Sequence, residues 1–211
     1  MIDHLVYAST DLQRAAADLA DRLGARPTPG GSHLGAGTHN ELLSLGGTRY
    51  LEVIGPDPGQ PAPDGPRPFG IDRLLAAALV GWCVRPRRPL DEIVADARSA
   101  GIELGSVASM SRRRPDGVLL EWKLTFPQLD GPFGCVLPFT IDWGQSPHPT
   151  DTLTSAVRLV GLEVFHPDSR RLAAALEIIG VDDDDVVVHA GGQPSLRATI
   201  ATEHGDVTLT S

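Results

Sequence analysis

Hydrophobic positions change period along the chain, and each change marks a switch between strand and helix. Residues 2–8 form a short β-branched and apolar run, which is typical of a strand. Leucines and alanines then recur at three- and four-residue spacing over residues 11–23, which predicts a helix with one apolar face. Asp11 stands where a helix N-cap is preferred, and Gly24 ends the pattern as a C-terminal glycine does.

This order of elements recurs along the chain, which predicts repeated βαβββ modules in a mixed α+β fold. In the first module, residues 1–55, a Gly-Gly turn joins strands 41–45 and 48–54 into a hairpin. The second module, residues 79–150, has a strand at 81–85, a helix from Pro89 to Gly101 and strand-like runs at 106–111, 118–126 and 135–143. The third, residues 151–211, is a partial and degenerate module with a strand at 157–165, a helix at 168–179 and strands near 184–189, 195–202 and 206–210.

Residues 56–78 join the first two modules and are rich in Pro and Gly, which is the composition of a surface linker. Residues 74–80 allow one short helix there. The chain contains no GxGxxG or GxxxxGK run and no strict alternation of strand and helix, which disfavours a doubly wound nucleotide-binding fold.

Net charge narrows the range of partners. The chain of 211 residues carries a formal net charge of −9, which repels both a nucleic-acid backbone and an anionic membrane surface. Two arginine clusters, at 85–88 and 112–114, are local exceptions. Each is interpreted as a solvated turn, and an anionic ligand is the alternative. The acidic run 182–185 is likewise interpreted as a solvated turn rather than a cation site.

Cysteine usage and the chain start favour the cytoplasm. Cys83 and Cys135 are too few and too far apart for a disulfide framework or a thiolate metal site, so both are expected to be reduced packing residues. The first residues lack the basic start and apolar run of a secretory signal. No apolar stretch approaches the roughly 20 residues of a membrane span, so no membrane partner is expected.

Two polar residues in otherwise apolar strands are candidates for chemistry. Strand alternation places His4 on the same face as Ile2 and Val6, and Glu52 lies between apolar neighbours where an unpaired carboxylate is costly to bury. An imidazole and a carboxylate are suitable ligands for a divalent metal. The alternatives are that the two side chains hydrogen-bond each other or nearby backbone, or that Glu52 faces solvent.

Three stretches of the chain resemble a known family. Asp3-His4-Leu5-Val6 before a helix, Gly37-Thr38-His39-Asn40, and Tyr50-Leu51-Glu52-Val53-Ile54 are similar to the opening module of the glyoxalase-like proteins of the vicinal oxygen chelate superfamily. Residues 138–143 resemble the strand that closes their second module. The resemblance implies a cupped mixed sheet built from paired modules, with metal ligands on the first and last strands of each.

The resemblance also implies a ligand set and a reaction class. His4 and Glu52 match two ligand positions, and alignment of residues 51–53 with residues 141–143 puts Asp142 at a third. The fourth position falls among residues 82–84, none of which is a usual ligand of a hard cation. A metalloenzyme of lyase, isomerase or dioxygenase type would then use zinc, nickel, manganese or iron(II) on a small oxygen-rich metabolite, with Glu52 or Asp142 as base where either is not a ligand.

Other candidates concern substrate contact. His39 and Asn40 enter a strand at the expected mouth of the cup, although a local turn explains them equally well. Glu121 faces either the cup or the solvent, and Trp82 and Trp143 are candidate walls for a small ligand. Two alternatives to an enzyme stay open, namely a metal-free protein that binds a small molecule in the same cup, and a structural dimer that retains only the fold. The third module is expected to be structural, covering a sheet edge or supporting a homodimer.

Overall fold

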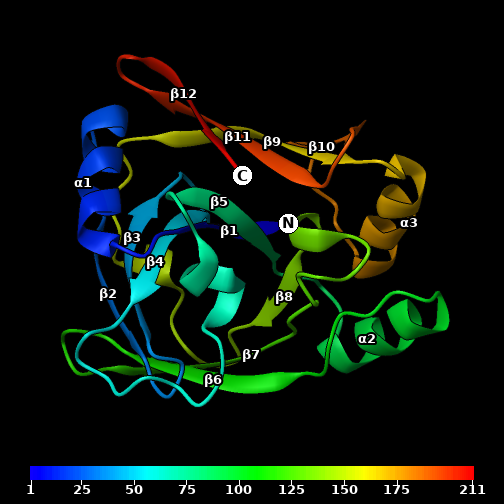
Figure 1. Cartoon of the computed structure of the whole chain (residues 1–211), viewed down its shortest axis with the longest axis horizontal. Helices are drawn as coiled ribbons and strands as arrows, with labels where there is room; N and C mark the ends of the chain where they lie inside the picture. Colours follow the sequence, from blue (N-terminus) through cyan, green and yellow to red (C-terminus); the bar gives the residue numbers. More distant parts are fainter.

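A computed structural model describes residues 1–211 as two packed β-sheets with three α-helices around them (Figure 1). The strands are β1 (Ile2–Ala8), β2 (Thr28–His33), β3 (Thr38–Ser44), β4 (Tyr50–Pro56), β5 (Ala78–Val84), β6 (Ala108–Arg113), β7 (Leu119–Leu124), β8 (Phe139–Asp142), β9 (Arg158–His166), β10 (Val186–Ala190), β11 (Ser195–Thr202) and β12 (Gly205–Thr210). The helices are α1 (Leu12–Leu23), α2 (Leu90–Ser99) and α3 (Ser169–Ile179), and short 3-10 turns lie at Pro68–Arg73, Gly134–Val136 and Pro149–Asp151.

Helix α1 forms as its sequence pattern predicts. The Asp11 carboxylate accepts a hydrogen bond from the backbone N–H of Arg14 at 3.1 Å, which satisfies one of the free donors of the first turn. Gly24 ends the helix in the left-handed region, at φ 66°, where a glycine has no steric cost. The helix buries the leucines and alanines of one face, namely Leu12, Ala15, Ala16, Leu19 and Leu23.

The first two modules close into one eight-stranded barrel, which confirms the expected cupped sheet. Its strand order is β1-β4-β3-β2-β6-β7-β8-β5, and β5 pairs with β1 to close it. Each half repeats one arrangement, in which the first strand of the module runs parallel to the last: β1 with β4, and β5 with β8. The parallel pairing requires a crossover, which α1 and α2 provide.

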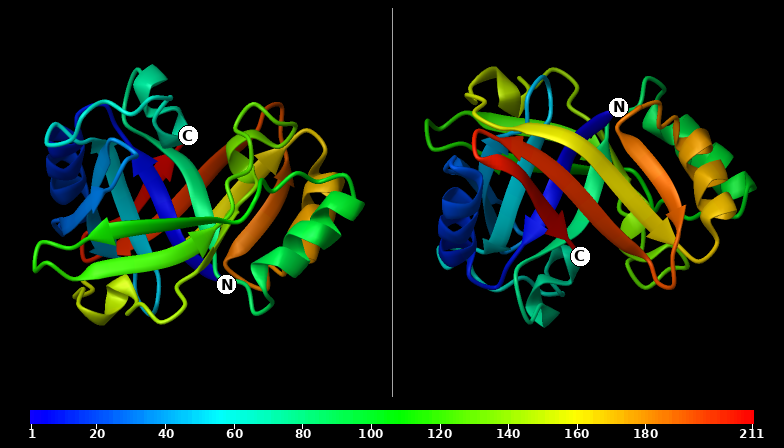
Figure 2. Two further views of the ribbon diagram at one scale, coloured as in Figure 1. Left: turned by 90° about the horizontal axis from the view of Figure 1, so that it is seen from below. Right: turned by 90° about the horizontal axis from the view of Figure 1, so that it is seen from above.

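The third segment has the predicted element order but a different strand order. Its sheet runs β10-β9-β11-β12, so β9 pairs in parallel with the strand directly after the helix, not with the last strand. It is therefore not a topological copy of the other modules. Its apolar face packs on the outside of the barrel at β1 and β5, where one core of 32 buried residues joins the two sheets (Figure 2).

The turn between α3 and β10 is tied to the barrel, so its interpretation as a solvated turn is wrong in part. The Asp183 side chain is 3% exposed and accepts hydrogen bonds from Arg49 Nη2 at 2.8 Å and from the Ile2 backbone N–H at 2.8 Å. Asp185 pairs with the other terminal nitrogen of the same Arg49 guanidinium. Only Asp182 and Asp184 are exposed.

Three local predictions need correction. Residues 74–80 form no helix, because the short helical turn lies earlier, at Pro68–Arg73, and β5 begins at Ala78. Strand β2, which lies between the first helix and the first predicted hairpin, is not among the predicted elements, because its Gly and Pro residues are more typical of a turn. The run 135–143 is divided between a 3-10 turn and β8. None of the helices has the length and apolar character needed to cross a membrane.

Candidate active site in the barrel interior

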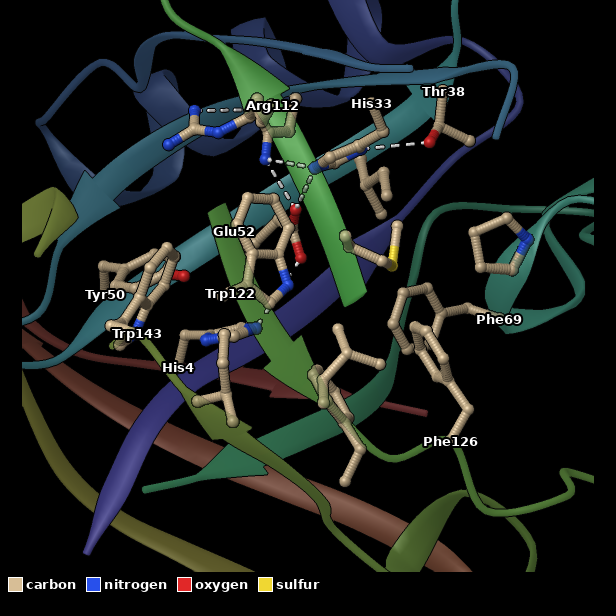
Figure 3. A pocket seen from close by; sticks show the side chains of 17 residues that line it. His4, His33, Thr38, Tyr50, Glu52, Phe69, Arg112, Trp122, Phe126 and Trp143 are labelled. Atoms are coloured by element: carbon tan, nitrogen blue, oxygen red, sulfur yellow. Dashed lines mark hydrogen bonds and ion pairs between the residues drawn. The ribbon is translucent and has the colours of Figure 1, made fainter. Parts of the chain in front are cut away.

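A pocket opens into the barrel, with an empty volume of about 500 Å³ that includes the open solvent at its mouth (Figure 3). Its wall is mostly apolar, with a polar group on one side. The lining residues are His4, His33, Thr38, Asn40, Tyr50, Glu52, Ile54, Pro68, Phe69, Met110, Arg112, Trp122, Leu124, Phe126, Phe139, Ile141 and Trp143. Both βαβββ modules contribute to it, but the polar side chains come from β1 to β4 and β6.

Strand alternation decides which candidates reach the pocket. Asn40 and Trp143 line it, whereas His39 lies between two inward residues of β3 and so points to the opposite face. Glu121 is exposed, because Leu120 and Trp122 on either side of it are residues of β7 that face inward. His39 and Glu121 therefore lie outside the pocket that they were predicted to contact.

Asp142 is also outside the pocket, so its prediction as a metal ligand or base is corrected. Ile141 and Trp143 face inward, and the intervening Asp142 side chain is exposed and accepts a hydrogen bond from the Gly144 backbone N–H at 2.9 Å. The alignment that placed Asp142 opposite Glu52 is therefore one residue out of step with the structure. A shift of one residue along a strand moves a side chain to the other face of the sheet.

Trp82 points out of the barrel into the core shared with the second sheet. It is fully buried there, and its Nε1 donates a hydrogen bond to the Val136 carbonyl at 2.8 Å. Its role as a pocket wall is thus contradicted. Trp122 and Trp143, with ring centroids 5.2 Å apart, form that wall.

His4 is held by a carboxylate beneath it. The register of β1 against β5 shifts between Ile2 and His4, and such an irregularity lets Asp3 reach the ring of its neighbour. His4 Nδ1 lies 2.7 Å from Asp3 Oδ1, so Nδ1 carries the proton and Nε2 presents its lone pair to the pocket. The ring also stacks on Tyr50, with centroids 4.6 Å apart.

Asp3 is fully buried and accepts from several donors. Its second oxygen accepts from Trp143 Nε1 at 3.1 Å and His148 Nε2 at 3.1 Å. Burial by itself raises the pKa of the Asp3 carboxyl, but the hydrogen bonds from His148 and His4 outweigh it and hold the pKa below its usual range. Asp3 is therefore a carboxylate at neutral pH, and it orients three side chains at once.

Glu52 lies at the centre of the polar group and is 7% exposed. Its Oε1 accepts a hydrogen bond from Asn40 Nδ2 at 2.6 Å, and its Oε2 lies 3.8 Å from His4 Nε2. Arg112 Nη1 donates to Asn40 Oδ1 at 3.2 Å, which fixes the orientation of the Asn40 amide. Oε2 accepts no hydrogen bond from the protein, so it is the oxygen available to a ligand.

His33 completes this group and was missed from the sequence. Its Nδ1 lies 3.0 Å from Thr38 Oγ1, and its Nε2 lies 3.6 Å from Glu52 Oε1. Burial lowers the pKa of His33 to about 4, although the nearby Glu52 charge opposes this, so the ring is neutral at pH 7. Its position in a Gly/Pro-rich stretch concealed it, and the only available signal was its spacing from Thr38 across a tight turn.

A wider groove meets the mouth of the pocket between residues 63–73 and 126–137. Phe69, Phe126 and Phe139 border both spaces, and their rings pack with centroids 5.5 to 5.7 Å apart. Phe69 adopts a positive φ of 59°, which is uncommon for a bulky residue. These rings therefore form the junction between the groove and the inner site.

Comparison with known proteins assigns the family. The model of the glyoxalase-like domain family matches residues 2–180 of the chain. The chain belongs to this family. The match confirms the resemblance to the glyoxalase-like proteins. No curated protein matches the chain.

Comparison with solved structures finds matches to this glyoxalase-like protein at low sequence identity. A hypothetical protein from Staphylococcus aureus superposes with a TM-score of 0.62 at 14% identity, over 92% of this chain and 86% of that one. The methylmalonyl-CoA epimerase from Mycobacterium tuberculosis gives 0.43 at 17% identity, over 72% and 91%. A Streptomyces coelicolor methylmalonyl-CoA epimerase complex gives 0.44 at 18% identity, over 71% and 98%.

Two groups of side chains in the glyoxalase-like barrel offer metal ligands. Asp3, His4 and Cys83 have ligand atoms within 4.8 Å of one another. This set does not fit an open site, because the Asp3 oxygens already accept hydrogen bonds and burial raises the pKa of the Cys83 thiol. The second group is His4 Nε2, His33 Nε2 and the Glu52 carboxylate, which line the pocket and are suitable ligand types for a divalent cation. His33 Nε2 lies 3.3 Å from Asn40 Nδ2, so the Asn40 amide would have to turn away for this nitrogen to bind a metal.

Proposed function

We propose that this protein is a metal-assisted enzyme that moves a proton next to a carbonyl group of a small oxygen-rich metabolite. The observation that carries the proposal is the buried Glu52 carboxylate, which lies between the Nε2 atoms of two imidazoles in an otherwise apolar pocket. Burying that charge is costly unless it is compensated, and one hydrogen bond from Asn40 compensates it only in part. A divalent cation or a proton would complete the compensation.

His4, His33 and Glu52 would hold the metal. Two imidazoles and one carboxylate are a common ligand set that leaves coordination positions open. When bound, the metal supplies Lewis-acid polarisation of a substrate oxygen. The orientation of His4 by Asp3 is the kind of outer contact that fixes the tautomer of a ligating histidine.

The protein groups around the metal define the rest of the chemistry. Asn40 holds Glu52 Oε1 at 2.6 Å, so Oε2 would be the atom that faces the metal, and Oε2 would accept a proton from the substrate only when it is not bound to the metal. Phe126 and Phe139 cover the side of the pocket that faces the groove and exclude water from the reacting atoms. The Trp143 ring forms another wall of the pocket, and the hydrogen bond from its Nε1 to Asp3 holds the ring in place.

The experiment is elemental analysis and zinc titration of protein prepared without a metal-chelating tag, comparing wild type with His4→Ala, His33→Ala and Glu52→Gln. His39→Ala is the matched control, because His39 lies on β3 next to the pocket residue Asn40 but faces away from the pocket. We expect about one equivalent of metal in wild type and in the control, and loss in the other variants. Equal uptake by His4→Ala and wild type would refute the ligand assignment.

A second candidate is a metal-free protein that binds a small apolar or aromatic molecule in the same pocket. It is favoured by the wall from the second module, where Phe139, Ile141 and Trp143 replace any ligating group. A wild-type protein that takes up no zinc, nickel, manganese or iron(II) but binds aromatic ligands would support this candidate over the enzyme.

A further inference from the structure

One buried donor in the pocket has no partner in the protein. The chain has three tryptophans, and two of their indole N–H groups are satisfied. Trp82 donates to the Val136 carbonyl and Trp143 donates to Asp3. Trp122 Nε1 is buried and donates to no acceptor of the protein, although the side chain lines the pocket (Figure 3). An indole N–H left in this way costs about 1–3 kcal/mol, so a ligand that accepts from it would be stabilised.

A buried guanidinium lies on the neighbouring strand. Arg112 is 3% exposed, its side chain makes one hydrogen bond, to Asn40, and no carboxylate lies within ion-pair distance. Burial lowers the pKa of Arg112, yet an arginine stays charged in proteins. Its neighbours differ, because Arg113 is exposed and Arg114 pairs with Asp116. Of these three, only Arg112 contributes its charge to the pocket.

The fold makes room for this charge. Gly30 in β2 lies against the pocket wall, and a Cβ at that position would overlap both Asn40 Oδ1 and Arg112 Nη1. Arg112 pairs with Leu120 across β6 and β7, and Trp122 is the next inward residue along β7. Diagonal neighbours on one face of a sheet have Cα atoms about 7–8 Å apart, so both side chains border the same stretch of the pocket wall.

We propose that Arg112 and Trp122 bind a carboxylate group of the substrate. This inference rests on the proposed function in one respect, since it names the substrate class of the same pocket as small carboxylic acids that carry a further oxygen group. A monoanion suits the site better than a phosphate, because the pocket offers one guanidinium and Glu52 already carries a negative charge nearby. The interpretation of the arginine cluster at 112–114 as a solvated turn is wrong for Arg112, which is buried in β6, whereas Arg113 is exposed at the end of the same strand.

The test uses the indole N–H signals in ¹⁵N–¹H spectra, assigned by single Trp→Phe substitutions. The probe is benzoate, and benzamide is its neutral isostere. We expect benzoate to move the Trp122 signal downfield in a saturable manner, benzamide to move it less, and the Trp82 signal to stay in place. An unchanged Trp82 signal also reports that each variant remains folded.

Arg112→Gln should weaken benzoate binding about tenfold or more, because a hydrogen bond to a charged group contributes about 1.5–3 kcal/mol. Arg113→Gln, which alters the adjacent exposed arginine, should leave it unchanged. Gly30→Ala should weaken binding by displacing the guanidinium. Equal responses to benzoate and benzamide, or full binding by Arg112→Gln, would overturn the proposal.

The titration is run on zinc-loaded protein and on protein stripped by a chelating resin, so that the two proposals fail separately. Metal uptake without a selective benzoate response in either sample overturns carboxylate recognition alone. A benzoate response in a protein that takes up no metal supports carboxylate recognition and overturns the metal function alone.

Discussion

Replacing Asp3 with Asn tests the support beneath the site, because an amide nearly matches the carboxylate in shape but differs in hydrogen bonding. In the native protein three donors converge on the two oxygens, from His4, Trp143 and His148. His148 is a donor at Nε2, since its Nδ1 accepts from the Thr150 backbone N–H at 3.3 Å. An Asn side chain has only one oxygen, so at least one position must place a donor against a donor.

Each orientation of the new amide has a cost that follows from these contacts. If its NH₂ group faces Trp143 and His148, both of those N–H groups lose their acceptor. If it faces His4, the imidazole must change tautomer and its Nε2 lone pair no longer points at the pocket. Two buried N–H donors left without an acceptor, at about 1–3 kcal/mol each, lower the free energy of unfolding by roughly 3 kcal/mol. For a chain of this size that corresponds to a fall in Tm of roughly 6–12 °C.

The assay combines thermal unfolding with zinc titration. Loss of a contact that orients a ligating histidine typically lowers metal affinity about 10- to 100-fold, so Asp3→Asn should weaken zinc binding by that order. Asp142→Asn is the control, because Asp142 is exposed and bonds only to the adjacent turn. If Asp3→Asn keeps its Tm within about 2 °C of wild type and binds zinc equally well, the reasoning about Asp3 is wrong.

Two further predictions concern other parts of the fold. Asp183→Asn should lower the free energy of unfolding by about 2–3 kcal/mol in denaturant, because it weakens a nearly buried ion pair with Arg49 that joins the second sheet to the barrel. Asp184→Asn, at the exposed neighbour, is the control and should have little effect. Equal unfolding midpoints for the two variants would contradict this prediction. Burial raises the pKa of the Cys83 thiol and so reduces its thiolate fraction. In a Cys135→Ser variant we therefore expect iodoacetamide to label Cys83 only after unfolding, as detected by mass spectrometry. Rapid labelling of Cys83 in the folded protein would contradict this and show that the barrel opens.

Local sequence was sufficient to predict most elements and part of the site. The helix at residues 11–23 followed from its own spacing and its two caps, which are contacts within one element. The inward direction of His4 followed from alternation in an apolar strand, whereas for Glu52 a position facing solvent stayed open until the structure placed it in the pocket. Family resemblance then supplied the cupped sheet, which no single segment could specify.

Tertiary structure decided the remaining features. A pattern of alternation defines two faces but not which one becomes the interior, so Asp142 and Trp82 were placed in the pocket although barrel closure turns both away from it. His33, Arg112 and Trp122 come together only through pairing of β2 with β6 and of β6 with β7. The β6–β7 pairing is a local hairpin, but the β2–β6 pairing joins different modules, so only barrel closure brings His33 to the other two residues. The sequence by itself thus determined most of the elements and the inward direction of His4, whereas the closed sheet determined which side chains share the pocket.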